Sequence, residues 1–445
     1  MKKPLIALIL LTLIGLFYRL YFINFQSFWM DESFSLNAVR LILEKGIPLL
    51  ANNQIYSNGL LYHYLSIPFY LFSEFGPRIL SAIFGTLIIP ITYLLSKKLF
   101  NSKTAILSAF FVTFLTILIA WSRQARFYTL FVFLFLLSLY FFITYLQNSS
   151  SKNFKLLLAS TILTILSNTL GFILIIVYLF YYKKFNLSLF KKNWHLFLIF
   201  LFALIYSIIN FNLIFVNYSK EYVSYLFKAH FSFMYLTLIS LFFFRKKLLI
   251  IVILTSLFIL SFFIPLFHFR YLLFLLPLFL ILTSALIIKI SFNLPKSLRY
   301  IILLILIALV LVNGFTFIPS KSYNLERFTP MPDFNSAYSF VKLNYSNQII
   351  IDAYPTLNKI YLDNINYSLD FTLSNLTFKE VDYNVYTGVN FISLDDLKEL
   401  DDCYIILDEF SFRGLDSNFK DYLETLDIAY EKVSDEFSYI RIYKC

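Results

Sequence analysis

Acidic residues are scarce over most of this 445-residue chain. The first 318 residues contain five of them, which are Asp31, Glu32, Glu44, Glu74 and Glu221. Hydrophobic residues make up 59% of the whole chain, and long apolar runs alternate with short clusters of Lys and Arg. A water-soluble domain of this length would not tolerate that pattern. The pattern therefore excludes a soluble enzyme and predicts a polytopic membrane protein.

Glycine and cysteine are also rare. The nine glycines form no nucleotide-binding pattern, so nothing points to a glycine-rich phosphate loop. The two cysteines, Cys403 and Cys445, permit one disulfide, but their number does not show that it forms. The first apolar run has a basic start and no small-residue cleavage site after it, so we expect it to remain as a transmembrane helix.

Charge is distributed unevenly along the chain. Residues 1–318 carry 26 Lys and Arg against five acids, whereas residues 319–445 carry 11 basic and 21 acidic side chains. The basic clusters lie between apolar spans, where anchoring at the cytoplasmic face explains them better than nucleic-acid binding. We therefore expect no nucleic-acid partner, a transmembrane domain over 1–318, and a differently solvated domain over 319–445.

Apolar runs of near-membrane length predict about eleven transmembrane helices. They are expected near 5–24, 79–96, 104–121, 129–146, 156–168, 170–182, 195–216, 231–244, 248–266, 271–288 and 300–318. The run 156–182 is short for two spans, and we interpret it as two short helices that turn at Asn168. The basic clusters then place the N-terminus in the cytoplasm and residues 319–445 outside it, in a multi-pass protein of the cell membrane.

Two further regions lie outside the membrane in this interpretation. The long first outer loop, 25–77, contains two expected interfacial helices at 37–46 and 59–72. The C-terminal region alternates apolar, β-branched runs with amphipathic segments, which predicts a small extracytoplasmic α/β domain. Its expected strands are 348–354, 403–410 and 438–445, and its expected helices are 334–345, 393–400 and 417–433.

Ionisable side chains gather at the predicted outer boundary of the membrane, where they are costly and therefore tend to be functional. Nine basic residues before position 319 lie outside the cytoplasmic clusters: Arg19, Arg40, Lys45, Arg78, Arg123, Arg126, Lys220, Lys228 and Arg270. The outer boundary collects Asp31, Glu32 and Glu74, four arginines (Arg78, Arg123, Arg126 and Arg270) and three histidines (His63, His230 and His268).

Carboxylates and guanidiniums at one membrane face suit the transfer of a sugar from a lipid phosphate. Guanidinium groups match phosphate oxygens and neutralise the leaving phosphate, while a carboxylate accepts the proton of the attacking hydroxyl. The bond to the anomeric carbon breaks through an oxocarbenium-like state, which nearby negative charge also favours. Nucleotide sugars are not normally supplied outside the cytoplasm, so a membrane-anchored donor fits this location.

Structural roles are open for the same residues. Asp31 could cap a helix that begins near Ser33. Arg123 and Arg126 could extend from helix ends to the lipid headgroups. The three histidines could be packed or interfacial side chains, because no close-spaced ligand pattern accompanies them as it would at a metal site.

Four segments in order resemble the membrane-embedded glycosyltransferases of the C-type fold. They are WMDESFSL, LLYHYLSIPFYLFSEFGPRILSAIFGTL, WSRQARFYTLFVFLFLLSLYFF and FRYLLFLLPLFLIL, and they cover roughly residues 1–290. The likeness is to the family 39 group, which includes protein O-mannosyltransferases, and to the lipid A aminoarabinose transferases. One departure is that Asn58 and Gly59 stand where the family often has two prolines.

The resemblance assigns roles to matching positions. It implies that Asp31 is the catalytic base or orients the acceptor, with Glu32 as a supporting carboxylate. It implies that the lipid-phosphate donor is bound by Glu74, Arg78, Arg123, Arg126, Tyr128, Arg270 and Tyr271. The histidines His63, His230 and His268 remain candidates for contact with an acceptor or a metal. The cofactor is undecided, with a divalent metal as the candidate.

The resemblance implies an inverting glycosyltransferase that moves a hexose or pentose from a polyprenyl or dolichyl phosphate carrier. The acceptor would be a protein, lipid or glycan at the outer membrane face. The alternative is a transporter or flippase of lipid-linked glycans, which predicts charged or polar residues in the middle of the spans. The centres of the predicted spans are instead almost purely Leu, Ile and Phe.

Overall fold

The computed structural model divides the chain into two compact units. Unit 1 comprises Met1–Tyr21, Ser57–Leu65 and Arg78–Ser320, and unit 2 comprises Phe22–Tyr56, Ser66–Pro77 and Lys321–Cys445. Most of the first outer loop therefore packs with the C-terminal region in unit 2. The residues that the structure describes are 2–50, 54–210, 215–228, 232–264, 268–323, 332–344, 348–362, 365–369, 389–435 and 438–445. The candidate residue His230 lies outside them.

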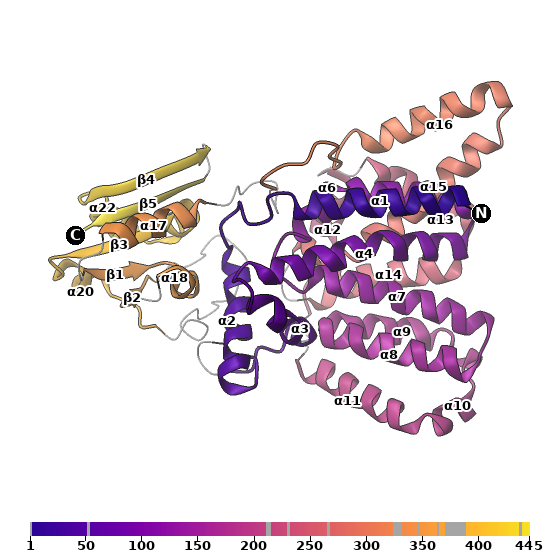
Figure 1. Cartoon of the computed structure of the whole chain (residues 1–445), viewed down its shortest axis with the longest axis horizontal. Helices are drawn as coiled ribbons and strands as arrows, with labels where there is room; N and C mark the ends of the chain where they lie inside the picture. The colour runs from indigo at the N-terminus through magenta and orange to yellow at the C-terminus, as the bar shows by residue number, and fades with distance from the viewer. Residues whose placement is uncertain are drawn as a thin grey trace. The chain divides into compact units, whose positions relative to one another are not determined.

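Unit 1 is built from helices, most of which are apolar (Figure 1). They are α1 (Lys2–Leu20), α4 (Gly76–Leu99), α5 (Ser102–Phe114), α6 (Thr116–Trp121), α7 (Tyr128–Gln147), α8 (Ser151–Ser167), α9 (Phe172–Leu179), α10 (Leu187–Lys192), α11 (Trp194–Asn210), α12 (Ser219–Lys228), α13 (Phe233–Phe244), α14 (Lys247–Phe263), α15 (Leu276–Phe292) and α16 (Lys296–Leu311). Helix α7 packs on α8, α13 on α15, and α1 on α5. Helix α3 (Leu60–Tyr70) begins in this unit and ends in unit 2.

Each of the eleven expected spans overlaps a helix within the described residues, which confirms the polytopic helical class. Within the described part of the chain, three helices are long and apolar enough to cross a membrane: Lys3–Leu20, Gly76–Leu99 and Tyr128–Gln147. Shorter apolar helices accompany them.

One expected span, 104–121, is interrupted. Helix α5 ends at Phe114, and Leu115 has an extended backbone with φ −66° and ψ 110° before α6 begins. The break pairs with the chain after α16, because the Thr116 N–H donates to the Gly314 carbonyl at 2.9 Å. The Thr316 N–H likewise donates to the Phe114 carbonyl at 3.0 Å. Hydrogen bonding to a distant segment thus replaces the helical bonds that hydropathy alone predicts.

Unit 2 contains a five-stranded sheet with the order β2-β1-β3-β5-β4. The strands are β1 (Ile349–Asp352), β2 (Tyr367–Ser368), β3 (Cys403–Asp408), β4 (Asp427–Asp435) and β5 (Ser438–Lys444). Strand β1 is parallel to β2 and β3, whereas β5 is antiparallel to β3 and β4. The helices of this unit are α2 (Met30–Lys45), α17 (Phe334–Asn344), α18 (Pro355–Tyr361), α20 (Leu394–Lys398), α21 (Glu409–Gly414) and α22 (Ser417–Leu423). The expected α/β domain is confirmed.

The expected helix over 417–433 is wrong in its second half. Helix α22 ends at Leu423, and residues 427–435 form strand β4. Strand β4 pairs with β5, so that Tyr430 faces Ile442 and Glu431 faces Arg441. The Arg441 Nε donates to the Glu431 carboxylate at 2.6 Å. Pairing with a strand that follows in the chain overrides the local helical pattern.

Cys403 and Cys445 form a disulfide across 42 residues of chain. Cys403 begins the buried central strand β3, and Cys445 is the last residue of the chain. The Cys445 N–H also donates to the Cys403 carbonyl at 3.0 Å. The covalent bond therefore ties the last strand to the centre of the sheet.

Two buried carboxyl groups lie at the carboxyl ends of the parallel strands β1 and β3. The Asp352 carboxylate accepts hydrogen bonds from the Tyr338 hydroxyl at 2.8 Å, the Tyr354 N–H at 2.8 Å and the Asn358 amide at 3.1 Å. The Tyr354 hydroxyl donates to Asp408 at 3.0 Å. These bonds join the sheet to α17 and to α18.

The pKa of Asp352 is raised from 3.8 to about 6, because burial and the nearby Asp408 carboxyl outweigh the three hydrogen bonds that favour the charged form. Burial also raises the pKa of Asp408. Because the folded-state pKa of Asp352 is raised, its contribution to stability is fully present below about pH 3.8. That contribution is lost as the pH rises through about 6.

We predict that protection of β1 amides from hydrogen exchange weakens by up to about 3 kcal/mol between pH 4 and pH 7. The Asp352→Asn variant should lose much of this dependence, because the amide cannot ionise. This pH dependence is measured by hydrogen exchange of the full-length protein in detergent, with exchange rates corrected for the intrinsic effect of pH. The exposed Asp401→Asn is the control, and an equally steep dependence in Asp352→Asn would contradict the assignment.

Candidate functional site

The turn between α6 and α7 carries two buried arginines, Arg123 and Arg126. The Arg123 guanidinium donates to the carbonyl oxygens of Tyr18 and Tyr21, where α1 ends. A helix C-terminus leaves carbonyl groups without intrahelical donors, so Arg123 satisfies two of them. Arg123 therefore holds the turn against the end of α1.

Arg126 and Arg270 lie against one aromatic ring. The guanidinium carbon of Arg126 is 5.7 Å from the centroid of the Tyr128 ring, and that of Arg270 is 5.6 Å from the same centroid. Arg270 is also 5.7 Å from the centroid of Tyr271. All three distances lie within the range of cation–π interaction. The structure thus brings together two pairs of residues that lie more than 140 positions apart in the sequence.

Trp121 and His268 extend this group. Trp121 is fully buried and packs edge-on against Tyr128, with ring centroids 4.9 Å apart, and against His268 at 6.4 Å. The His268 Nδ1 accepts the N–H of Arg270 at 3.2 Å, at the start of the short 3-10 helix Phe269–Leu272. His268 therefore has a structural role that positions Arg270.

Tyr222 of α12 also belongs to this group of residues, although no sequence pattern indicates it. It is almost fully buried, and burial raises its pKa well above the usual range. The backbone of His268 and the nearby Arg270 guanidinium lower this pKa, whereas Tyr271 raises it. No motif singles out Tyr222 among the 33 tyrosines of the chain.

His63 is fully buried on α3 and lies close to the same turn. Burial, together with the positive charge of Arg126, lowers the pKa of His63 to about 3, so its imidazole is neutral at physiological pH. The preceding Tyr62 shares a hydrogen bond of 2.8 Å with Ser81, which donates to the Arg126 carbonyl at 3.1 Å. These bonds fasten α3 and α4 to the turn.

Gly59 allows this close packing. Its φ is +79°, which favours glycine, and a Cβ at this position would lie 2.4 Å from the Phe127 ring. The residue that departs from the prolines of the family thus lets the start of α3 approach the arginine turn.

Arg19 is a buried arginine that the sequence marked only as lying outside the cytoplasmic clusters. Its guanidinium donates to the Ser122 hydroxyl at 3.1 Å and to the Gly15 carbonyl at 2.9 Å. A Cβ on Gly85 would come within 2.1 Å of the Ser122 hydroxyl oxygen, so Gly85 makes room for this contact. Arg78, in the first turn of α4, is also fully buried.

The charge of unit 1 is strongly one-sided. It contains 24 Lys and Arg, and its only acidic residue is Glu221, which is exposed on α12. Arg19, Arg78, Arg123 and Arg126 are all buried. A buried guanidinium is costly unless acceptors or anions compensate it, so this group suits a negatively charged ligand such as a phosphate.

The two adjacent acids of the first outer loop lie in unit 2, in the first turn of α2. Helix α2 begins at Met30 with Trp29 as its N-cap residue, so the alternative that Asp31 caps a helix starting near Ser33 is wrong. The buried Glu32 carboxylate accepts the Trp29 N–H at 3.1 Å, which gives Glu32 a structural role at the helix start. Asp31 is half-buried beside it.

The C-terminal region holds the segment 26–33 in place within unit 2. The Gln26 side chain exchanges two hydrogen bonds with the Tyr323 backbone, at 3.0 and 3.1 Å. The Phe28 N–H donates to the Tyr361 hydroxyl at 2.9 Å, and Ser33 bonds to the Thr356 hydroxyl at 2.7 Å. Asp31 is therefore carried on a segment that α18 fixes.

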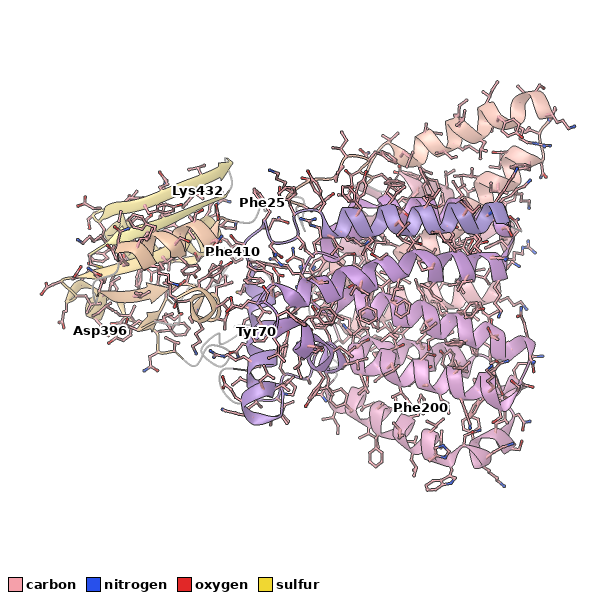
Figure 2. All side chains as sticks on the ribbon, viewed as in Figure 1. Phe25, Tyr70, Phe200, Asp396, Phe410 and Lys432 are labelled. Carbon is pink, nitrogen blue, oxygen red and sulfur yellow. A yellow bond between two sulfur atoms is a disulfide. The ribbon has the colours of Figure 1, made fainter. Side chains whose placement is uncertain are left out.

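Glu74 lies in the turn after α3, in unit 2, whereas Arg78 four residues later lies in unit 1. Glu74 lines a small cavity with Tyr70, which ends α3 and is labelled in Figure 2. Partial burial raises the pKa of Glu74. Glu74 thus lines a cavity within unit 2.

No three His, Cys, Asp or Glu side chains gather as metal ligands would in the part of the chain that the structure describes. We therefore assign no metal ligands and derive no step through a metal.

Comparison with known proteins agrees with this fold. Residues 61–211, about a third of the chain, match the family model described as dolichyl-phosphate-mannose-protein mannosyltransferase. A protein of uncharacterised function from Aquifex aeolicus (strain VF5) is 32% identical over 191 residues. This stretch covers 41% of the present chain and spans only 38% of that relative.

Solved structures match over nearly the whole chain. ArnT from Cupriavidus metallidurans, bound to undecaprenyl phosphate, has a TM-score of 0.59 at 11% identity and covers 98% of this chain and 97% of its own. The oligosaccharyltransferase AglB from Archaeoglobus fulgidus, in complex with an inhibitory peptide and a dolichol-phosphate, has a TM-score of 0.58 at 10% identity. That match covers 97% of this chain and 73% of AglB. The chain thus has the C-type glycosyltransferase fold, and the resemblance noted in the sequence is confirmed.

We predict that Tyr361→Phe loosens the segment 26–33, because it removes the acceptor of the Phe28 N–H and keeps the ring. Loss of one hydrogen bond to a buried N–H should speed amide exchange at Phe28 by roughly fivefold. Hydrogen exchange of the full-length protein measures this, with Tyr404→Phe on β3 as the matched control. Unchanged exchange at Phe28 would show that the C-terminal region does not hold this segment.

Proposed function

We propose that this protein is an inverting glycosyltransferase of the cell membrane. It moves a hexose or pentose from a polyprenyl or dolichyl phosphate to a protein, lipid or glycan acceptor at the outer face. The observation that carries the proposal is the pair of guanidiniums, Arg126 and Arg270, beside Tyr128 in a unit with a single acidic residue. The C-type fold and the match of residues 61–211 support it.

Unit 1 supplies the donor side of the reaction. Arg126 and Arg270 bind the phosphate of the lipid carrier, and Tyr128 and Tyr271 keep the two guanidiniums in position through their rings. Arg78 adds to the positive field, and Arg123 holds the turn that carries Arg126. Fixed positive charge is most useful for a negative charge that grows during the reaction, as it does on the departing phosphate.

The proposed base is Asp31. The Asp31 carboxylate takes the proton of the acceptor hydroxyl, and the hydroxyl oxygen then bonds to the anomeric carbon. The bond between that carbon and the phosphate oxygen breaks, and its electron pair leaves with the lipid phosphate. Attack opposite the leaving group inverts the anomeric configuration. Glu32 contributes by fixing the helix start that carries Asp31.

The proposed topology keeps the N-terminus in the cytoplasm and unit 2 outside it. The basic clusters between the apolar helices favour this orientation. The disulfide between Cys403 and Cys445 supports it as well, since disulfides persist mainly in oxidising compartments.

We predict that Asp31→Asn lowers sugar transfer by roughly a hundredfold or more, because the amide cannot accept the hydroxyl proton. Purified full-length protein is incubated with a panel of lipid-phosphate sugars and an acceptor mixture. Mass analysis of the modified acceptor and the released lipid phosphate measures transfer.

The matched control for Asp31 is Asp401→Asn, which removes an exposed acid from the same unit. It should transfer at the wild-type rate. Transfer retained by Asp31→Asn would remove Asp31 from the mechanism, and a wild-type protein that forms no glycosidic bond would favour transport of the lipid-linked glycan.

We predict that Arg126→Gln and Arg270→Gln each raise the KM for the lipid-phosphate donor about ten- to a hundredfold, since each removes a charged partner of the phosphate. Steady-state kinetics with varied donor concentration separates this from an effect on kcat. Arg245→Gln, an exposed arginine between α13 and α14, is the control. A donor KM unchanged in both variants would contradict the assignment of the phosphate site.

A further inference from the structure

Unit 2 contains an open cavity of about 210 Å³ that is lined by three separate segments of the chain. Helix α2, the end of α3 with the turn that follows it, and helix α18 each contribute side chains. The polar side chains that line it are Asn37, Arg40, Tyr70, Glu74, Thr356 and Lys359. All of them belong to unit 2.

The lining combines hydrogen-bond donors and acceptors with little net charge. Arg40 donates to the Asn37 side-chain oxygen at 3.3 Å and lies 3.8 Å from the Glu44 carboxylate, which offsets part of its charge. Lys359 is a second cation of the lining, and Glu74 contributes a carboxyl group. A phosphate site would present donors without a carboxylate, whereas sugar hydroxyls both donate and accept.

The aromatic ring and the size of the cavity agree with a sugar. Tyr70 offers an apolar ring face together with a hydroxyl, which suits the apolar faces and polar edges of a pyranose. A volume of about 210 Å³ is below the roughly 300 Å³ at which pockets for drug-sized ligands begin. One ring-sized group therefore fits, and Leu36 and Ile360 supply apolar contacts beside the polar groups.

The cavity shares helix α2 with the proposed base. Asn37 follows Asp31 by six residues, which corresponds to about 9 Å along a helix that rises 1.5 Å per residue. The opposite wall is α18, whose Thr356 bonds to Ser33 at 2.7 Å and whose Tyr361 fixes Phe28. A group bound here is thus held by the same two helices that position Asp31.

We propose that this cavity binds a sugar unit of the acceptor, so that the acceptor is a glycan or glycolipid. The proposal rests on the glycosyltransferase function and names its acceptor class. Binding of one sugar unit in the cavity would hold a neighbouring hydroxyl of the acceptor near Asp31. The C-terminal region then serves in acceptor recognition as well as in holding the segment 26–33.

Saturation-transfer NMR of the purified full-length protein in detergent tests the proposal. The probes are the methyl glycosides of glucose, mannose, galactose and N-acetylglucosamine, and inorganic phosphate is a separate arm. At least one glycoside should bind, and Lys359→Met and Asn37→Ala should each reduce its signal at least threefold. Lys398→Met and Asn335→Ala, exposed residues of the same unit, are the matched controls and should bind as the wild type does.

A second readout separates this proposal from the proposed function. Release of lipid phosphate from the donor with water as acceptor should be unchanged in Lys359→Met, while transfer to a glycan acceptor should fall at least threefold. The cavity assignment would be overturned by absence of glycoside binding, by displacement of the glycoside by inorganic phosphate, or by unchanged binding in both variants. In each of these cases, release of lipid phosphate would still support the transferase. A wild-type protein that releases no lipid phosphate would instead overturn the transferase itself.

Discussion

The excess of positive charge in unit 1 is the constraint on which the rest of the structure depends. Buried guanidiniums cost several kcal/mol unless oxygen acceptors or anions compensate them, and this unit has one acidic residue of its own. Backbone carbonyls and a serine hydroxyl bind Arg123 and Arg19, and aromatic rings flank Arg126 and Arg270. The arrangement concentrates positive charge at one group of residues, which is why we propose a lipid phosphate as its ligand.

The two acids of the first outer loop have different roles although they are adjacent. Glu32 is buried and accepts the backbone N–H of Trp29, so helix α2 depends on it for its first turn. Asp31 is half-buried and is not the N-cap residue. Glu32 thus has a structural role at the helix start, and the proposed mechanism assigns the base to Asp31.

The C-terminal region belongs to the same unit as the acids. Helix α18 binds the backbone of Phe28 and the hydroxyl of Ser33, and the buried Asp352 ties α18 to the sheet through Tyr354 and Asn358. The sheet, α18 and the segment 26–33 therefore form one continuous structure. In this arrangement the C-terminal region acts as a support for Asp31, and it completes the wall of the polar cavity.

Hydropathy and charge along the sequence predicted the helical membrane class, the approximate positions of the spans, the α/β domain and the choice of Arg126 and Arg270. These features depend on local composition, because a span must be apolar over its own length and a charge at membrane depth is costly wherever it lies. The choice of Tyr128 and Tyr271 came from the family resemblance. Only the tertiary structure decided that 427–435 is a strand, that 104–121 is broken, that Glu74 and Arg78 fall in different units and that Tyr222 joins the site. Each of these depends on a partner distant in the chain, such as β5 for β4 or Gly314 for Thr116, and no local pattern records which partner a backbone or side chain will meet.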